Sequence, residues 1–238
     1  MPDSAQGFSL GSLARTHEGR PGLPRGRSRL PAPEVRASQR ERLQRAVIAA
    51  SAESGYGDVT VADIVRRAKV SRVAFYAHYR SKDDCFLEAT GAGGQLLAGQ
   101  VLAAAHAVVE DAAPQDPPDE EVLRAGIRAF LVFLAEEPEF ARVFYVDMPA
   151  AGPAAVERLH DAMGRFADIN RKWHERARER HPDWPAVPAE AYLAVAGATG
   201  ELVRSMVRAD RAKELRDLED TVVALHLAVM AGRPWGSA

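Results

Sequence analysis

Apolar residues recur three or four positions apart along most of the chain, which is the spacing of one face of an α-helix. Leu43, Ala46, Val47 and Ala50 form the first such stripe. Clusters of Gly and Pro interrupt the pattern, and no segment alternates as a strand would. The pattern therefore predicts an all-α protein with nine helices, at about 34–54, 61–68, 72–79, from 82 onward, from about 120 to Pro138, 138–149, 153–180, 189–210 and 215–231.

Short polar side chains mark where several of these helices begin. Thr60 with Asp63, Ser38 with Glu41, and Ser81 with Asp84 have the spacing of capping boxes, and Ser71 is placed to cap the helix that follows it. Gly55 supplies a helix stop. Lys69 and Val70 form a tight turn. The glycines of "GAGG" (91–94) predict a weakened or bent stretch in a long helix.

Composition narrows the class of protein. The chain has 238 residues, of which 47% are hydrophobic, so it can bury a real core. A single cysteine excludes an internal disulfide framework and a multi-cysteine zinc site. No apolar run approaches the roughly 20 residues of a spanning helix, and the N-terminus lacks a signal-peptide core. We expect a soluble cytoplasmic protein with no cofactor, no metal and no membrane partner.

Charge is distributed unevenly along the chain. Residues 1–80 contain 14 basic and 7 acidic residues, whereas the remainder contains 17 basic and 26 acidic residues. A basic front on an acidic body indicates that the front faces a polyanion. Residues 1–33, rich in Gly, Pro, Ser and Arg, are predicted to be a flexible basic arm. The arm either contacts DNA non-specifically or reflects a start placed too far upstream.

The three predicted helices between residues 34 and 79 form a compact unit that ends in a helix-turn-helix. A short third helix fits the major groove of DNA, which is about 12 Å wide. Arg72, Tyr76 and His78 would give this helix polar side chains, while Val70, Phe75 and Tyr79 would hold it against its neighbours. Taken alone, His78 could equally be a structural histidine, and Arg72 could be a solvated charge.

The segment "TVADIVRRAKVSRVAFYAHYRSKDDCFLEA" resembles the DNA-binding signature of the TetR family of bacterial transcriptional regulators. The shared features are a Thr-capped helix, Asp-Ile, a turn ending in Val-Ser, an aromatic pair, His-aromatic, and Ser-Lys-acidic. The upstream "AVIAASAESGYGDVT" is similar to the family's first helix and its Gly-Tyr exit. The resemblance covers about residues 40–90.

The resemblance implies roles for individual residues. Phe75 and Tyr79 match buried positions, Lys69 replaces a common turn glycine and so predicts a strained or altered turn, and Cys85 replaces a leucine as a small buried hydrophobe. The positions that would contact DNA bases or phosphates are Thr60, Ser71, Arg72, Val73, Tyr76, His78 and Lys82.

For the remainder of the chain the resemblance implies a ligand pocket and a dimerising pair of final helices. Ala194, Gly197, Ala198 and Thr199 offer a small-residue face, and Val222, Val223, Leu225 and Val229 would pack against it; ordinary packing within one chain is the alternative. The pocket candidates, each also explicable as plain core, are Phe130, Phe133, Phe144, Phe166, Asn170 and Trp173.

These observations favour a homodimeric repressor that a small-molecule effector releases from a palindromic operator in double-stranded DNA. The alternative is an effector-independent or activating regulator of the same fold. An enzyme is disfavoured because the sequence has no Gly-x-Ser-x-Gly elbow, Walker loop or His-Glu-x-x-His motif. The expected domains are an arm (1–33), a helix-turn-helix domain (34–81) and a ligand-binding and dimerisation domain (82–238).

Overall fold

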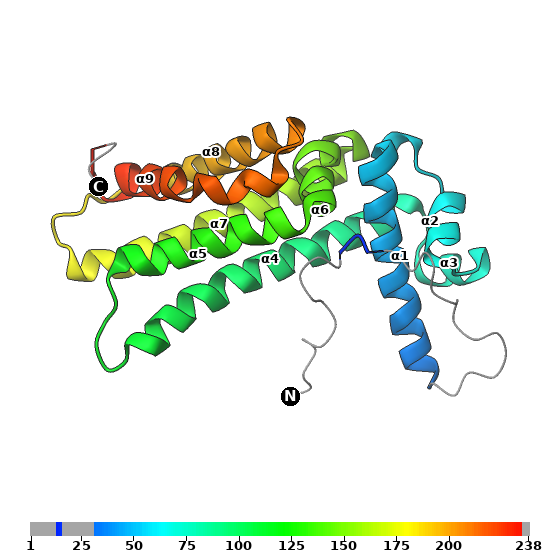
Figure 1. Ribbon diagram of the computed structural model, residues 1–238, viewed down its shortest axis with the longest axis horizontal. Coiled ribbons are helices and arrows are strands. Elements are labelled where there is room, and N and C mark those ends of the chain that lie inside the picture. The colour runs from blue at the N-terminus through cyan, green and yellow to red at the C-terminus, as the bar shows by residue number, and fades with distance from the viewer. Residues whose placement is uncertain (1–12, 16–30, 235–238) are drawn as a thin grey trace. The chain divides into compact units, whose positions relative to one another are not determined.

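Helices make up all the regular structure in residues 13–15 and 31–234, the part of the chain that this computed structural model describes (Figure 1). Within these residues there is no strand, so the all-α prediction is confirmed. Four short 3-10 or π turns, η1 to η4, join some of the helices. The helices are α1 (Ala32–Ser54), α2 (Val61–Ala68), α3 (Arg72–His78), α4 (Lys82–Ala112), α5 (Asp119–Glu136), α6 (Pro138–Arg142), α7 (Pro153–Arg180), α8 (Ala189–Arg208) and α9 (Glu219–Met230).

The chain forms two compact units, and each is described by itself. The first unit contains residues up to Gly93 together with Glu136–Arg158, and so holds α1, α2, α3, the first part of α4, and α6. The second unit contains Gly94–Ala135 and the residues from Leu159 onward. The predicted domain boundaries, at residues 33/34 and 81/82, stay a prediction.

Helix α1 begins earlier than its predicted capping box. It starts at Ala32, after Pro31 and with Pro33 in its first turn, and no side chain caps it. Ser38 and Glu41 lie inside the helix, so the capping box predicted for them is wrong. Proline is tolerated in the first turn because the N–H groups there have no intrahelical acceptor.

The inner face of α1 follows the predicted stripe, and α1 packs against α2 and α6 within the first unit. Gly55 ends the helix with φ of 78°, as the stop signal predicts. Cys85 is fully buried beneath α1, where its thiol lies 3.7 Å from the carbonyl of Leu43. Burial raises the pKa of this thiol far above its usual value, which confirms that Cys85 behaves as a small buried hydrophobe. The buried stripe consists of Leu43, Ala46, Val47 and Ala50.

The "GAGG" segment does not bend or break α4, which runs through it without interruption. Its glycines have a packing role instead. A Cβ placed on Gly93 would lie 2.2 Å from the ring of Phe140, a fully buried side chain of α6. The predicted weakening is therefore replaced by a close approach between α4 and α6 that only glycine permits.

The segment predicted as one helix over 138–149 is divided. Helix α6 ends at Arg142, a π turn (η2) covers Val143–Asp147, and a 3-10 turn (η3) covers Met148–Ala151. The apolar side chains of Val143, Phe144 and Tyr145 remain buried through the change of helix type. Periodicity alone cannot separate these helix types, because their apolar spacings overlap over a single turn.

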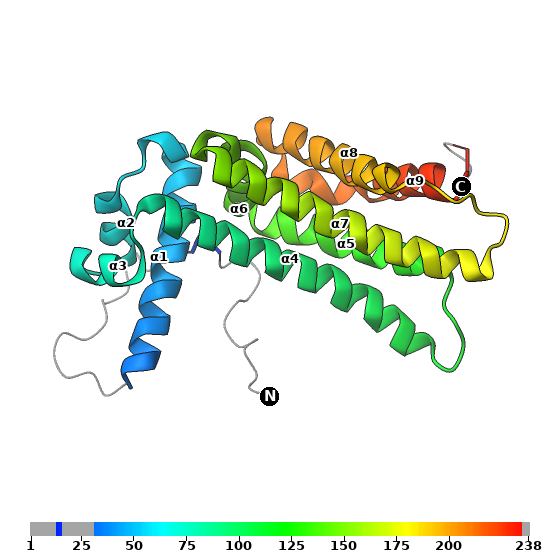
Figure 2. The ribbon, with the colours of Figure 1, turned by 180° about the vertical axis from the view of Figure 1, so that it is seen from behind.

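In the second unit, α8 and α9 lie side by side (Figure 2). The last predicted helix is divided here as well: residues 212–218 form a 3-10 turn (η4), and α9 begins only at Glu219. The Glu219 carboxylate receives two hydrogen bonds from the guanidinium of Arg128 on α5, at 2.8 and 2.7 Å, and one from Arg124 at 3.2 Å. These ion pairs connect α5 to the start of α9.

Helix α4 also differs from the sequence expectation about apolar runs. Among the described residues it is the one helix whose length and composition would allow it to cross a membrane. Length and composition are weak evidence by themselves, because a helix of a soluble protein can pass the same test.

Candidate functional site

The helix-turn-helix begins with a complete capping box on α2. The N–H of Asp63 donates to the Thr60 hydroxyl oxygen at 3.3 Å, and the N–H of Thr60 donates to the Asp63 carboxylate at 3.2 Å. The Thr60 hydroxyl also donates to this carboxylate at 2.6 Å, and these bonds lower the pKa of Asp63. The predicted cap is confirmed, and it holds Thr60 at an exposed position.

The turn between α2 and α3 places Lys69 in the left-handed region, with φ of 52° and ψ of 42°. The N–H of Val70 reaches back to the carbonyl of Val65 at 3.2 Å and so closes the end of α2. A left-handed non-glycine residue costs roughly 1–2 kcal/mol. The strained turn predicted from the absence of glycine is therefore present, and it sets the angle at which α3 leaves α2.

Helix α3 divides sharply between a buried side and an exposed side. Ser71 caps it by accepting a hydrogen bond from the N–H of Ala74 at 3.1 Å. Phe75 and Tyr79, at the inward positions, are 0% and 4% exposed, which confirms their predicted burial. On the opposite side Val73 is 83% exposed and Tyr76 is 49% exposed.

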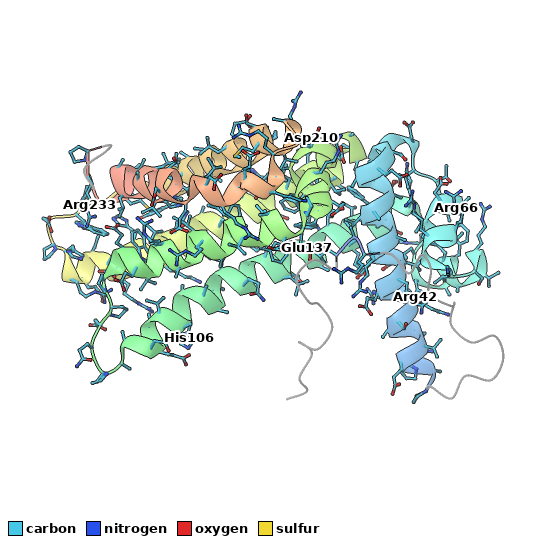
Figure 3. The ribbon with its side chains drawn as sticks, in the orientation of Figure 1. Arg42, Arg66, His106, Glu137, Asp210 and Arg233 are labelled. Atoms are coloured by element: carbon cyan, nitrogen blue, oxygen red, sulfur yellow. The ribbon has the colours of Figure 1, made fainter. Side chains whose placement is uncertain are left out.

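The exposed side of α3 combines cationic, aromatic and apolar groups. The Arg72 guanidinium lies 5.8 Å from the centre of the Tyr76 ring, which is cation–π range. The side chain of Arg66 on α2 is exposed as well (Figure 3). A rigid inner side with a chemically mixed outer side is what a helix needs if it is to be inserted into a groove of DNA.

Glu88 on α4 holds the end of α3, a role that the sequence did not indicate. Its carboxylate accepts a hydrogen bond from the Tyr79 hydroxyl at 2.9 Å and a two-pronged ion pair from Arg40 of α1, with Gln44 as a further donor. Burial raises the pKa of Glu88, but the hydrogen bonds from Arg40, Tyr79 and Gln44 and the charge of Arg40 together outweigh burial, so the pKa falls. The charged carboxylate therefore joins α1, α3 and α4.

Lys82 also has intramolecular partners that the sequence did not predict. Its ammonium donates to the carbonyl oxygens of Val59 at 2.8 Å, Tyr56 at 3.0 Å and Gly57 at 3.4 Å. It stands 4.4 Å from the centre of the Tyr56 ring, whose hydroxyl donates to Asp83. Lys82 thus fixes the turn η1 (Tyr56–Asp58) that leads into α2; its predicted phosphate contact stays a prediction.

His78 is half-buried at the end of α3. Its Nε2 lies 3.1 Å from the amide oxygen of Gln39 on α1. Burial lowers the pKa of His78, and the positive charges of Arg40 and Arg36 lower it further. The imidazole is therefore mainly neutral at pH 7, and a phosphate contact from it would be a hydrogen bond rather than an ion pair.

The six predicted ligand residues do not form one described cluster. In the second unit, the rings of Phe130 and Phe166 meet edge to face, with centroids 5.3 Å apart. Trp173 belongs to a different group in that unit: its indole N–H donates to the carbonyl of Asp119 at 3.0 Å, and its ring is 5.8 Å from that of Trp184.

The other three ligand candidates do not lie in one unit. Phe133 is buried and Asn170 is half-buried in the second unit. Phe144 belongs to the first unit, where its ring is 5.4 Å from that of Phe140. The ligand assignment therefore stays a prediction for all six residues.

The geometry defines a helix-turn-helix protein, and comparison with known proteins shows which family this part of the chain resembles. Residues 48–89 match the family model described as "Bacterial regulatory proteins, tetR family". This segment contains α2, α3, the strained turn at Lys69 and the Glu88 carboxylate.

Solved structures with the same fold cover most of the chain. The fatty acid degradation regulator FadR from Bacillus halodurans has a TM-score of 0.70 at 16% identity, covering 79% of this chain and 94% of its own. FadR from Bacillus subtilis, solved in complex with stearoyl-CoA, has a TM-score of 0.66 at 16% identity, covering 79% and 98%. A tetR-family regulatory protein from Rhodococcus RHA1 has a TM-score of 0.58 at 21% identity, covering 81% and 97%.

Together, the family match over residues 48–89 and the shared fold agree with the resemblance found in the sequence: the helix-turn-helix segment is similar to TetR-family regulatory proteins, and the chain has the fold of solved TetR-family regulators. The matched family model and the similar structures are described as regulatory proteins, which favours the regulatory interpretation of the chain over the enzymatic one.

Proposed function

We propose that the protein is a homodimeric repressor that binds a palindromic operator through α3 and leaves it when a small-molecule effector binds. The DNA-binding part of the proposal rests on the two sides of α3. Phe75 and Tyr79 are buried inside the unit, while Val73 and Tyr76 are exposed. Side chains held outward on a rigid helix can read base edges with little additional loss of conformational entropy.

Each predicted contact residue has a role in this proposal. Arg72, at the first position of α3, would read a guanine in the major groove, and Ser71 and Val73 would lie against the bases or the adjoining backbone. The phosphate contacts would come from Thr60, Tyr76, His78 and Lys82. Lys82 would contact a phosphate directly. It would also support DNA binding indirectly, by holding the turn η1 in place.

Replacing Tyr76 with Ala should weaken binding to all DNA sequences, because a phosphate contact carries no sequence information. If an adjacent cation is displaced as well, the slope of log affinity against log salt should become shallower, by about 0.9 for each phosphate that the protein no longer neutralises. Fluorescence anisotropy over a range of about 50–200 mM salt, in which phosphate contacts change the affinity strongly, gives both quantities. His106→Ala, an exposed change on α4, is the control. Unchanged affinity in the Tyr76 variant would remove that residue from the interface.

Dimerisation is proposed through α8 and α9. On α8 the exposed side carries Ala194, Gly197 and Ala198, whose small side chains permit close helix contact, next to Leu193, which is 37% exposed. Thr199 is buried instead, and its hydroxyl donates to the carbonyl of Val195. On α9, Val222 and Val223 are buried while Leu225 and Val229 are half-buried, so the latter two are the better candidates for contact with a second chain.

Sedimentation should show a species of twice the chain mass of 25.8 kDa. Gly197→Arg should convert it to a monomer that remains folded, because a Cβ on Gly197 meets nothing within 4 Å in the single chain. Gly99→Arg on α4 has equally open surroundings and is the matched control. A Gly197→Arg protein that still sediments as a dimer would place the interface elsewhere.

The effector part of the proposal is supported by the FadR structure from Bacillus subtilis that was solved with stearoyl-CoA. A ligand can release DNA only through different affinities for the DNA-binding and non-binding states. Ligand-dependent loss of operator binding would separate this proposal from an effector-independent or activating regulator. In either case we propose a cytoplasmic location, where operator DNA is accessible.

A further inference from the structure

A residue near the N-terminus is part of the packed first unit. The side chain of Leu13 is 6% exposed, and its backbone N–H donates to Oε2 of Glu137 at 3.0 Å in a buried hydrogen bond. Glu137 is itself only 2% exposed. The two residues are 124 positions apart in the sequence, so this contact is tertiary and not a local turn.

Glu137 occupies a particular place in the fold (Figure 3). It is the N-cap residue of α6, yet its side chain makes no capping bond to the first turn of that helix. The usual N-cap side chains, those of Ser, Thr, Asp and Asn, accept a hydrogen bond from the first turn of their own helix. Here the side chain accepts the N–H of Leu13 instead. A buried carboxylate is costly unless donors surround it, so the N-terminal segment helps to make this residue tolerable.

Residues 13–15 are the described part of the N-terminal segment. Leu13 is buried, Ala14 is half-buried and Arg15 is exposed. The receiving residue adjoins α6, which packs against α1 in the same unit. The contact thus offers the chemistry of a small peptide-binding site: a place for one apolar side chain and a buried acceptor for the N–H of the same residue.

We propose that Leu13 and Glu137 form an intramolecular docking site in which the chain's own N-terminal segment is the ligand. The site attaches this segment to the start of α6, and α1 attaches the chain again at Ala32. Five arginines, at positions 15, 20, 25, 27 and 29, lie between the two points of attachment.

Hydrogen exchange of the full-length protein, followed by mass spectrometry, tests the docking site. In the wild type, the Leu13 amide should exchange at least about tenfold more slowly than the same sequence in a free peptide. Leu13→Ala removes the buried side chain, and Glu137→Met removes the acceptor while keeping a side chain of similar size that can be buried. Each change should accelerate exchange toward the rate of the free peptide. The double variant should exchange no faster than either single variant, because each change alone already opens the site. Arg15→Ala, at an exposed neighbouring position, should leave the rate within about twofold.

Two outcomes would overturn the docking site. One is a Leu13 amide that exchanges at the free-peptide rate in the wild type. The other is an amide that stays equally protected in Leu13→Ala and Glu137→Met when both variants retain the helical circular dichroism of the wild type. The second outcome would mean that the protection comes from groups other than these two.

Discussion

The Lys82→Met variant is expected to lose about 1–3 kcal/mol of unfolding free energy, since removing the donor of a partly buried acceptor costs roughly that much. The ammonium of Lys82 donates to the carbonyls of Tyr56, Gly57 and Val59, and methionine keeps the apolar stem while removing all three donors. These carbonyls belong to the turn that leads into α2. Chemical denaturation without DNA measures the intramolecular effect separately from any contact with phosphate.

Arg80→Met is the matched control for this change. Arg80 also precedes the body of α4, but its side chain is 96% exposed and its ion pair with Asp84 spans 3.5 Å. A surface pair of this kind contributes little, so the control should stay within about 0.5 kcal/mol of the wild type. Equal stability of the two variants would show that the carbonyl contacts of Lys82 add nothing to the fold.

Two glycines of α4 are expected to respond to the same substitution in opposite directions. Gly93→Ala should lower the unfolding free energy by about 1–3 kcal/mol, because its Cβ would meet the buried ring of Phe140 at 2.2 Å. Gly99→Ala should raise it by about 0.5–1 kcal/mol, because alanine favours a helix and nothing lies within 4 Å of the new Cβ. Thermal and chemical denaturation of both variants measure the difference.

The opposite signs make this pair informative. Helix propensity is the same in both substitutions, so it cancels in the comparison and leaves only the packing against α6. A stabilised Gly93→Ala protein would mean that the Phe140 ring moves aside at little cost, and the close approach of α4 and α6 would then not depend on glycine.

Features set by neighbouring residues could be predicted from the sequence. The Thr60 cap, the Ser71 cap, the Gly55 stop and the inward position of Phe75 all depend on residues within one or two helical turns. Such signals act over short distances and survive in almost any tertiary context. The Ser38 box failed because proline could begin α1 six residues earlier.

Features that depend on distant residues could not be predicted. The Lys82 ammonium bonds carbonyls more than twenty residues away, Glu88 joins residues from α1 and α3, and Glu137 accepts an N–H from Leu13. A lone charged residue in a sequence does not indicate its partner. The buried and exposed positions of α3 could therefore be predicted from the sequence. The groups that hold α3 in place could be recognised only in the folded chain.

Selection from a random duplex library tests the central claim, that this chain is a sequence-specific DNA-binding regulator acting as a symmetric pair. The full-length protein, at a fixed salt concentration, should enrich a two-fold symmetric sequence whose half-sites are about 34 Å apart or a multiple of that distance. The enriched site should bind at least about a thousandfold more tightly than unselected DNA. A library that emerges without any enriched sequence, or an affinity equal for selected and random DNA, would contradict the account.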